Sequence, residues 1–245
     1  MTWVLDLDGV VWLGDRPIPG SAEAVARLRA GGERVVVVTN NSSLTVDQYL
    51  TKLDRLGIPT GAGDLITSAQ VAATLMAAGE RVLVCAGPGV TEAVVGGGGE
   101  PVDDGPADAV VVGWTRAFDY DLLTRAMRAV RGGARLIGTN DDPTYPTPDG
   151  VLPGGGSLVA AVAYAAGEAA VFAGKPHAPM AAAVTERVGR VDVMVGDRPD
   201  TDGLLARRLG ARFALVLTGV TRRQDLPVEP EPDEIADDLA ALVRA

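Results

Sequence analysis

Acidic residues follow two apolar runs of the kind that forms buried strands. Asp6 and Asp8 stand at the end of the first run, and Asp197 and Asp202 follow a run near the end of the chain. Alternation along a strand directs Asp6 and Asp8 to the same side, where two carboxylates repel unless a cation or a shared proton intervenes. Oxygen ligands favour Mg²⁺ over zinc, and the chain has one histidine and one cysteine. The pattern predicts a magnesium site, although Asp8 followed by glycine is also a frequent turn signal.

Two further polar segments contain groups that can bind phosphate. Thr39, Asn40 and Asn41 follow another apolar run, and hydroxyl and amide groups at the edge of a parallel sheet can hold a phosphate. Lys175, one of only two lysines, lies in a short turn before an alanine-rich segment. This turn is not a P-loop, because proline occupies the place of the required Ser or Thr. Taken alone, the segment at Thr39 is also typical of a helix-capping loop, and the segment at Lys175 is also typical of an ordinary turn. His177 is expected to be a helix-start residue.

Short apolar runs alternate with amphipathic segments along the chain, which predicts an α/β fold with a mainly parallel sheet. The expected strands cover residues 2–7, 34–38, 81–85, 108–112, 135–138, 191–195 and 212–217. Thr45 and Gln48 match a capping box, which predicts a helix that ends at Gly57. Another helix is expected over 22–30, and the acidic, proline-rich stretch 227–233 is expected to be a solvated link to a last helix.

Composition narrows the classes of partner. The chain has 245 residues and a net charge of −10, so neutralisation of nucleic-acid phosphates or binding to an anionic membrane is not expected. The single cysteine excludes an internal disulfide and suits a reducing compartment, so the cytoplasm is the expected location. No signal peptide and no membrane span are expected, because an acidic residue at position 6 and the short apolar runs fit neither.

Taken together and in order, four motifs resemble those of the haloacid dehalogenase-like phosphatase superfamily. They are Asp6-Leu7-Asp8-Gly9-Val10, Thr39-Asn40-Asn41, Gly174-Lys175-Pro176, and Gly196-Asp197 with Asp202. Segments at 67–70, 139–142, 153–157 and 217–220 are similar to the NagD-like branch, which carries a type C2 cap. The resemblance covers nearly the whole chain. It implies a Rossmann-like, doubly wound parallel core at 1–68 and 172–245, with a smaller α/β cap inserted at 69–171.

The resemblance also implies how the residues divide the chemistry. Asp6 would be the nucleophile that forms an aspartyl-phosphate, and Asp8 would protonate the leaving alcohol and then activate water. Asp6, the backbone carbonyl of Asp8, and Asp197 would hold Mg²⁺. Lys175 would offset charge on the phosphate and the nucleophile. Asp202 would anchor either a metal-bound water or Lys175.

The resemblance places the substrate between the core and the cap. The residues expected to contact it are Thr39, Asn40, Asn41, Asn140 and Asp142, with Tyr145 in the same loop as the last two. That loop runs from Thr139 to Pro148. Glycerol phosphate or phosphoglycolate are the expected kind of substrate, since only 4% of the residues are aromatic and few could stack on a nucleotide base. Asp200 is expected outside the site.

Other activities stay open at this point. A phosphotransferase or phosphomutase would use the same two aspartates and differ only in the acceptor of the phosphoryl group. A dehalogenase needs no metal and would not require Asp8 and Asp197. A non-catalytic sugar-phosphate-binding module could keep the same fold, and a homodimer through the cap is kept as a possible assembly.

Overall fold

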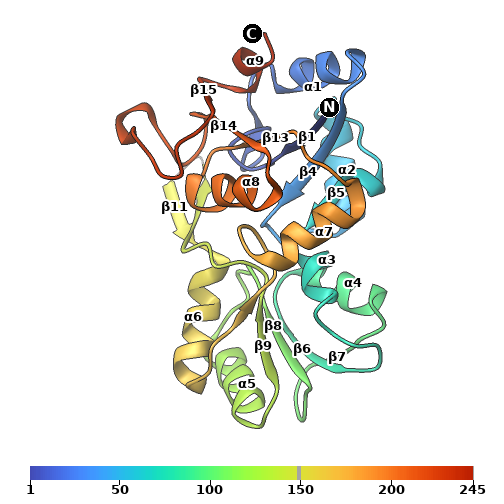
Figure 1. The fold of residues 1–245 in the computed structure, drawn as a ribbon. Coiled ribbons are helices and arrows are strands. Elements are labelled where there is room, and N and C mark those ends of the chain that lie inside the picture. The colour runs from blue at the N-terminus through green and yellow to red at the C-terminus, as the bar shows by residue number, and fades with distance from the viewer. Residues whose placement is uncertain (148–149, 245) are drawn as a thin grey trace.

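The computed structural model describes residues 1–147 and 150–244. Two lobes stand one above the other in Figure 1, and the upper lobe contains both ends of the chain. Pro148, the predicted end of the substrate loop, and Ala245, the last residue of the predicted core, lie outside the described residues. Within the described ranges, no helix is long and apolar enough to cross a membrane.

The upper lobe is built on a parallel sheet of six strands. In spatial order they are β15 (Glu234–Ala236), β14 (Arg212–Val216), β13 (Val193–Gly196), β1 (Thr2–Leu5), β4 (Arg34–Thr39) and β5 (Leu65–Thr67). The chain starts at the centre, proceeds to β4 and β5, and later returns to β13 on the other side of β1. The strand order therefore reverses beside β1, and the crevice at such a point is where ligands bind in sheets of this kind.

Helices cover both faces of the first sheet, as the doubly wound arrangement requires. They are α1 (Ser21–Ala30), α2 (Val46–Arg55), α3 (Ser68–Ala73), α7 (Ala178–Val188), α8 (Leu204–Leu209) and α9 (Leu239–Leu242). Alternate residues of β4 divide between the two faces: Val35 and Val37 pack with α1, α2 and α9, and Val36 and Val38 pack with α3, α7 and α8. Both faces being covered explains why this strand reads as a continuous apolar run.

The lower lobe contains a second parallel sheet. Its strands in spatial order are β12 (Val171–Phe172), β9 (Arg135–Gly138), β8 (Ala109–Val112), β6 (Arg81–Cys85) and β7 (Glu100–Val102), and its helices are α4 (Pro88–Gly96), α5 (Tyr120–Arg131) and α6 (Gly155–Ala166). Phe172 pairs with Gly138 in this sheet, so the second sheet extends one residue past the boundary predicted at 171. The apolar cluster on α3 and α7 also includes Val82 and Val111, which joins the two lobes.

Two short antiparallel hairpins complete the fold. One consists of β2 (Trp12–Leu13) and β3 (Arg16–Pro17), and the other of β10 (Thr144–Thr147) and β11 (Gly150–Pro153). The second hairpin occupies the predicted substrate loop, where no strand was expected. Figure 1 shows β11 beside the upper lobe, although the chain enters this hairpin from the lower one.

The boundaries of some elements differ from the predicted ones. The capping box is present, with Thr45 accepting from the backbone N–H of Gln48, and α2 ends at Arg55. The first strand was expected to reach Leu7 but ends at Leu5. The carbonyl of Leu7 instead accepts hydrogen bonds from the backbone N–H groups of residues 10, 11 and 12. Asp6 directly follows the strand, and its backbone N–H donates to the carbonyl of Val195 at 2.9 Å, whereas Asp8 lies where the chain turns. Strand alternation therefore does not relate the directions of the two side chains.

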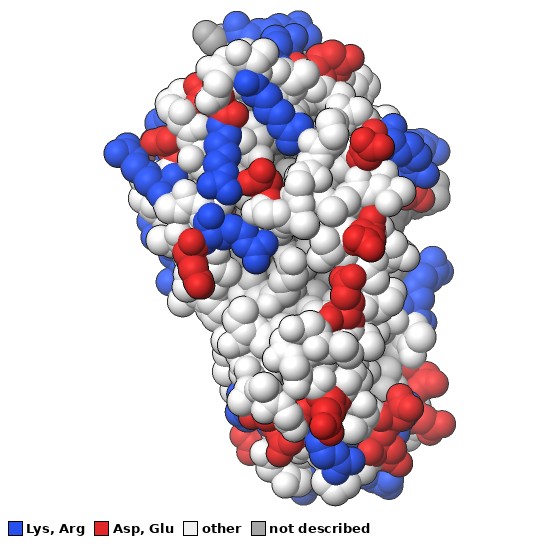
Figure 2. All heavy atoms as spheres, turned by 90° about the vertical axis from the view of Figure 1, so that its right-hand side faces the viewer, with Lys and Arg blue, Asp and Glu red and all other residues white. Residues whose placement is uncertain are grey.

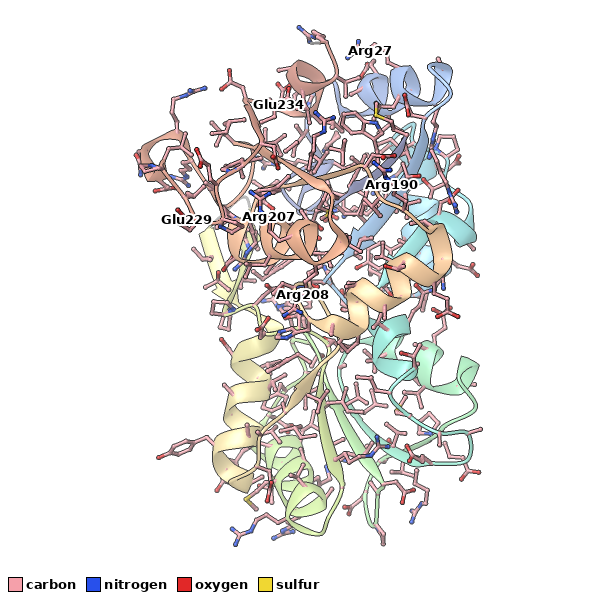
Figure 3. All side chains as sticks on the ribbon, in the orientation of Figure 1. Arg27, Arg190, Arg207, Arg208, Glu229 and Glu234 are labelled. Atoms are coloured by element: carbon pink, nitrogen blue, oxygen red, sulfur yellow. The ribbon has the colours of Figure 1, made fainter. Side chains whose placement is uncertain are left out.

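The acidic segment 227–233 leads into a strand that the sequence pattern did not predict. Asp233 accepts from the backbone N–H of Phe213 at 2.8 Å. Arg207 of α8, which is labelled in Figure 3, donates to the carbonyl of Glu231 at 2.5 Å. These contacts hold the segment against the sheet and place β15 next to β14. On the face drawn in Figure 2, acidic and basic side chains are mixed in both lobes, with uncharged residues over much of the surface between them.

Candidate active site

A pocket lies where the carboxyl ends of β1, β4 and β13 meet the loop that follows β9. Its walls include these residues that the sequence motifs pointed to: Asp6, Asp8, Thr39, Asn40, Asn41, Asn140, Asp142, Tyr145, Lys175 and Asp197. Asp202 is completely buried behind the wall. The structure therefore brings together side chains separated by up to about 190 positions, because parallel strands end at one edge of their sheet.

The ammonium of Lys175 lies between two buried carboxylates. Its Nζ is 2.6 Å from Oδ1 of Asp6 and 2.7 Å from Oδ1 of Asp202, and the lysine is 1% exposed. The other oxygen of Asp202 accepts from the backbone N–H groups of Asp197 and Arg198, at 3.2 and 3.1 Å. Of the two partners predicted for Asp202, the structure thus pairs it with Lys175.

The carboxylate of Asp197 completes an acidic cluster. One oxygen from each of Asp6, Asp197 and Asp202 lies within 4.8 Å of the others, and all three residues are buried. Oδ2 of Asp197 accepts from the backbone N–H of Val220 at 2.5 Å, whereas Oδ1 is buried without a hydrogen-bond partner among the described residues. Three carboxylates and one ammonium leave two negative charges. An oxygen-lined cluster with that charge and an unpaired oxygen fits a hard divalent cation.

Burial and neighbouring charges shift the pKa values of the groups in this cluster. Burial raises the pKa of Asp6 well above its usual value, and Lys175 opposes part of the rise. Burial, followed by the charge of Asp202, raises the pKa of Asp197 to about 7. Burial lowers the pKa of the Lys175 amine, but Asp202 and Asp6 outweigh it and the pKa ends above its ordinary value. The ammonium is therefore charged, and it does not offset the whole rise in the pKa of Asp6 and Asp197.

Asp8 occupies a different environment from Asp6. Its Oδ1 accepts from the indole N–H of Trp12 at 3.0 Å and from the hydroxyl of Tyr145 at 3.4 Å. Its carboxylate is not part of the cluster around Lys175. Burial raises the pKa of Asp8, and Lys52 and then Trp12 oppose the rise. A raised pKa suits a carboxyl group that must carry a proton near neutral pH.

Asn40 joins the two lobes. Its Nδ2 donates to Oδ2 of Asp142 and to the carbonyl of Lys175, both at 3.0 Å, and its Oδ1 accepts from the backbone N–H of Lys175 at 2.7 Å. The Asn140 amide donates to the carbonyl of Asn40 at 2.7 Å and accepts from the backbone N–H of Asp142. Two of the three side-chain amides predicted to contact substrate, Asn40 and Asn140, are thus hydrogen-bonded within the protein.

Thr39 and Asn41 form the floor of the pocket after β4. The hydroxyl oxygen of Thr39 accepts from the backbone N–H of Asn41 at 3.1 Å, which leaves its hydrogen available for donation. Oδ1 of Asn41 accepts from the backbone N–H and the hydroxyl of Ser43 at 3.0 and 2.7 Å. These bonds fix the turn that presents the Thr39 hydroxyl to the pocket.

Several wall residues were not predicted from the sequence. Arg198 lies between the lobes: Nη1 is 3.9 Å from the Asp142 carboxylate and donates to the carbonyl of Thr144 at 3.4 Å. Its position directly after Asp197 was the one feature of the sequence that could have placed Arg198 in the site.

Asp200 is largely exposed, as expected, and pairs with Arg198. His177 precedes α7 as a helix-start residue, with Nε2 2.9 Å from the Asp141 carboxylate.

Comparison with known proteins places these features in a family. A family model described as haloacid dehalogenase-like hydrolase matches residues 3–100, and a second, described as HAD-hydrolase-like, matches residues 172–242. D-glycerol 3-phosphate phosphatase of Mycobacterium tuberculosis is 40% identical over 98% of this chain and 70% of its own length. The chain belongs to the haloacid dehalogenase-like hydrolase family.

A second relative and a solved structure are also similar over most of their length. Glycerol-3-phosphate phosphatase of Homo sapiens is 38% identical over 100% of this chain and 90% of its own length. The crystal structure of glycerol phosphate phosphatase from Mycobacterium tuberculosis in complex with magnesium has a TM-score of 0.89 and 37% identity, over 98% of this chain and 75% of that one. The predicted family and the predicted fold class are confirmed.

Proposed function

We propose that this haloacid dehalogenase-like hydrolase is a Mg²⁺-dependent phosphatase that hydrolyses a small phosphate monoester through Asp6. The observation that carries the proposal is the buried cluster of three carboxylates and one ammonium at the point where the strand order reverses. The enzyme class is supported by relatives that are named phosphatases and share at least 38% identity with this chain.

The first step transfers the phosphoryl group to the protein. A carboxylate oxygen of Asp6 attacks phosphorus, and the bond between phosphorus and the leaving oxygen breaks with its electron pair on that oxygen. Asp8 gives the leaving oxygen a proton, so that an alcohol departs. In the second step Asp8, now ionised, takes a proton from water, whose oxygen attacks phosphorus and frees Asp6 and inorganic phosphate.

The remaining residues of the site would bind the phosphoryl group and the metal ion. The Thr39 hydroxyl would donate to a phosphoryl oxygen, and the Lys175 ammonium lies where it can meet both the phosphoryl group and Asp6. Asp6 and Asp197 would hold Mg²⁺ through carboxylate oxygens, with the backbone carbonyl of Asp8. When bound, Mg²⁺ neutralises charge on the carboxylates and on the phosphoryl group.

The composition and the relatives both point to a small substrate, since only 4% of the residues are aromatic and few could stack on a nucleotide base. We propose glycerol phosphate as the substrate, because two relatives that align with nearly the whole chain are named for it. Phosphoglycolate stays a prediction from the sequence, and no observation favours a phosphotransferase or a non-catalytic binding module.

More specific assignments belong to this proposal as well. The NagD-like branch is supported by the second parallel sheet between β5 and α7, which corresponds to an inserted cap. All four of Thr39, Asn40, Asn140 and Lys175 line the pocket. Thr39 and Lys175 would contact the phosphoryl group, whereas the amides of Asn40 and Asn140 would act by holding the two lobes together. A cytoplasmic location is supported by the single buried cysteine, Cys85. A homodimer through the second lobe stays a prediction.

Hydrolysis of p-nitrophenyl phosphate tests the mechanism. We expect turnover with Mg²⁺, loss of turnover with EDTA, and at least a hundredfold loss for Asp6→Asn, because the amide is not a nucleophile and removes one negative charge from the cluster. Mg²⁺ should also raise the melting temperature of the wild type by mass action. Asp54→Asn, on the exposed surface of α2, is the matched control and should behave as wild type.

The outcomes separate the parts of the proposal. Full activity in EDTA would contradict the metal requirement, and full activity of Asp6→Asn would contradict the assigned nucleophile. A panel that includes glycerol phosphate, phosphoglycolate and a nucleoside monophosphate then tests the substrate. A nucleoside monophosphate with the highest kcat/KM would contradict glycerol phosphate as the substrate.

A further inference from the structure

The carboxylate of Asp8 receives two hydrogen bonds on the same oxygen. Trp12 and Tyr145 both donate to Oδ1, at 3.0 and 3.4 Å, and no other described side chain hydrogen-bonds this carboxylate. Oδ2 is not among the buried oxygens that lack a partner, and Asp8 lines the pocket. The second oxygen is therefore the one left to face a substrate.

The donor from the first lobe is held rigidly. Trp12 lies in β2, four residues after Asp8, and is 1% exposed. The ammonium of Lys52 lies 4.1 Å from the centre of its ring and donates to the carbonyl of Gly14 at 2.8 Å. The ammonium over the ring face and the close packing of Trp12 fix the orientation of the ring. The indole N–H therefore points toward Asp8.

The second donor, the hydroxyl of Tyr145, comes from the β10–β11 hairpin and reaches the same oxygen, Oδ1 of Asp8. Tyr145 lies in β10, and its ring packs against Trp114 with the ring centres 5.3 Å apart. The indole N–H of Trp114 donates to the carbonyl of Pro153 in β11 at 3.1 Å. The 3.4 Å contact is long for a hydroxyl donor, as catalytic hydrogen bonds often are before substrate binds.

We infer that Trp12 and Tyr145 are positioning residues for Asp8, which hold the carboxyl group through Oδ1 so that Oδ2 carries the proton given to the leaving oxygen. An indole N–H can only donate, so the proton of the acid form cannot lie between Oδ1 and Trp12. When the bond from phosphorus breaks, the leaving oxygen keeps the electron pair and takes the proton from Oδ2. The carboxylate that forms already has two donors on Oδ1.

This inference rests on the proposed function, and it competes with a simpler role for Tyr145. The hydroxyl could instead bind a hydroxyl group of the leaving alcohol. The two roles differ in what they depend on. Positioning of a proton donor matters most when the leaving oxygen is basic, whereas a binding contact depends on the groups that the alcohol carries. Phenyl phosphate and p-nitrophenyl phosphate separate them, because neither leaving group has a further hydroxyl and phenoxide is much the stronger base.

The experiment compares kcat/KM for these two esters, a ratio that reports the step in which the leaving group departs. For Tyr145→Phe we expect a loss of about tenfold with phenyl phosphate, equivalent to roughly 1.4 kcal/mol, and less than about twofold with p-nitrophenyl phosphate. Trp12→Phe should likewise lower kcat/KM more for phenyl phosphate than for p-nitrophenyl phosphate. Tyr164→Phe removes a hydroxyl from a tyrosine that is 93% exposed in α6 and should leave both values unchanged.

Each result decides the inference. An equal loss on both esters, or unchanged values for Tyr145→Phe, would overturn it, since neither outcome depends on the basicity of the leaving group. Unchanged values on both esters together with a rise in KM for glycerol phosphate would assign Tyr145 to substrate binding instead. If Trp12→Phe fails to fold, the ratio for Tyr145→Phe still decides. A wild type that hydrolyses neither ester would overturn the proposed function itself, which distinguishes that failure from this one.

Discussion

Replacing Lys175 with methionine removes the ammonium that holds Asp6 and Asp202 together while keeping most of the aliphatic stem. The two ion pairs that this substitution breaks are 2.6 and 2.7 Å long, and both carboxylates are buried. The charge of the cluster, with Asp197 included, changes from two negative charges to three. We expect the variant to fold, to be less stable, and to lose turnover by at least a hundredfold because the nucleophile loses its counter-charge.

The fall in stability follows from the burial of both ion pairs. Breaking a buried ion pair by removing one partner costs about 3–5 kcal/mol. For a chain of this size the fall corresponds to a melting temperature lower by roughly 6–20 °C. Mg²⁺ should restore more stability to the variant than to the wild type, because the cluster is more negative.

Thermal unfolding with and without Mg²⁺, together with p-nitrophenyl phosphate hydrolysis, checks this reasoning. Lys52→Met is the matched control for stability, since it removes the other lysine, whose contacts are a carbonyl oxygen, an aromatic ring and the exposed carboxylate of Asp15. It should cost only about 1 kcal/mol. The reasoning is refuted if Lys175→Met melts at or above the wild-type temperature in EDTA, because the three carboxylates would then not be a charged, buried cluster.

Two other predictions follow from close contacts and burial. A side chain at Gly9, where φ is +89°, would place its Cβ 2.5 Å from Cγ of Asp197, so Gly9→Ala should lose activity and the stabilisation by Mg²⁺; an unchanged kcat would contradict the packing of Asp197. Burial raises the pKa of Cys85 to about 12, and since the thiolate is the reactive form, roughly one molecule in ten thousand is reactive at pH 8. A thiol reagent should therefore label the protein only on unfolding, and rapid labelling of the native protein would show that Cys85 is accessible.

The elements that sequence reasoning located are those whose pattern is set locally. Residues 34–39 form a strand buried on both faces, and a continuous apolar run is the direct signature of that environment. The capping box before α2 involves residues three positions apart. By contrast, β15 has three residues, acidic neighbours, and a position set by Arg207 and Asp233. The β10–β11 hairpin contains Pro146, and proline argues against a strand unless its N–H faces away from the partner.

For the site, the motifs located the residues but not their hydrogen bonds. The motifs at Asp6, Thr39 and Asp197 each follow a strand of the six-stranded sheet, so their convergence on one edge follows from topology. Lys175 instead follows β12 of the second sheet, and its place in the pocket depends on how the two lobes pack. What Asn40 does depends on Asp142, 102 positions away, whose place is set by packing of the second lobe. The motif predicted that the Asn40 amide binds phosphate, whereas in the structure it is hydrogen-bonded to the protein. The pairing of Asp8 with Tyr145 has the same origin, since it exists only where the hairpin meets the first lobe.

The net charge of −10 raises the question of how such a protein would accept a dianionic phosphate. At about 0.15 M salt, exposed charges are screened beyond roughly 8 Å, so the balance is set inside the pocket. There, without a cation, the cluster carries two excess negative charges, and burial raises the pKa of Asp6 and Asp197. Protons would relieve that charge, but a protonated Asp6 is a poor nucleophile. A divalent cation relieves it and leaves Asp6 ionised, so the same ion that makes room for the phosphate also keeps the attacking group reactive.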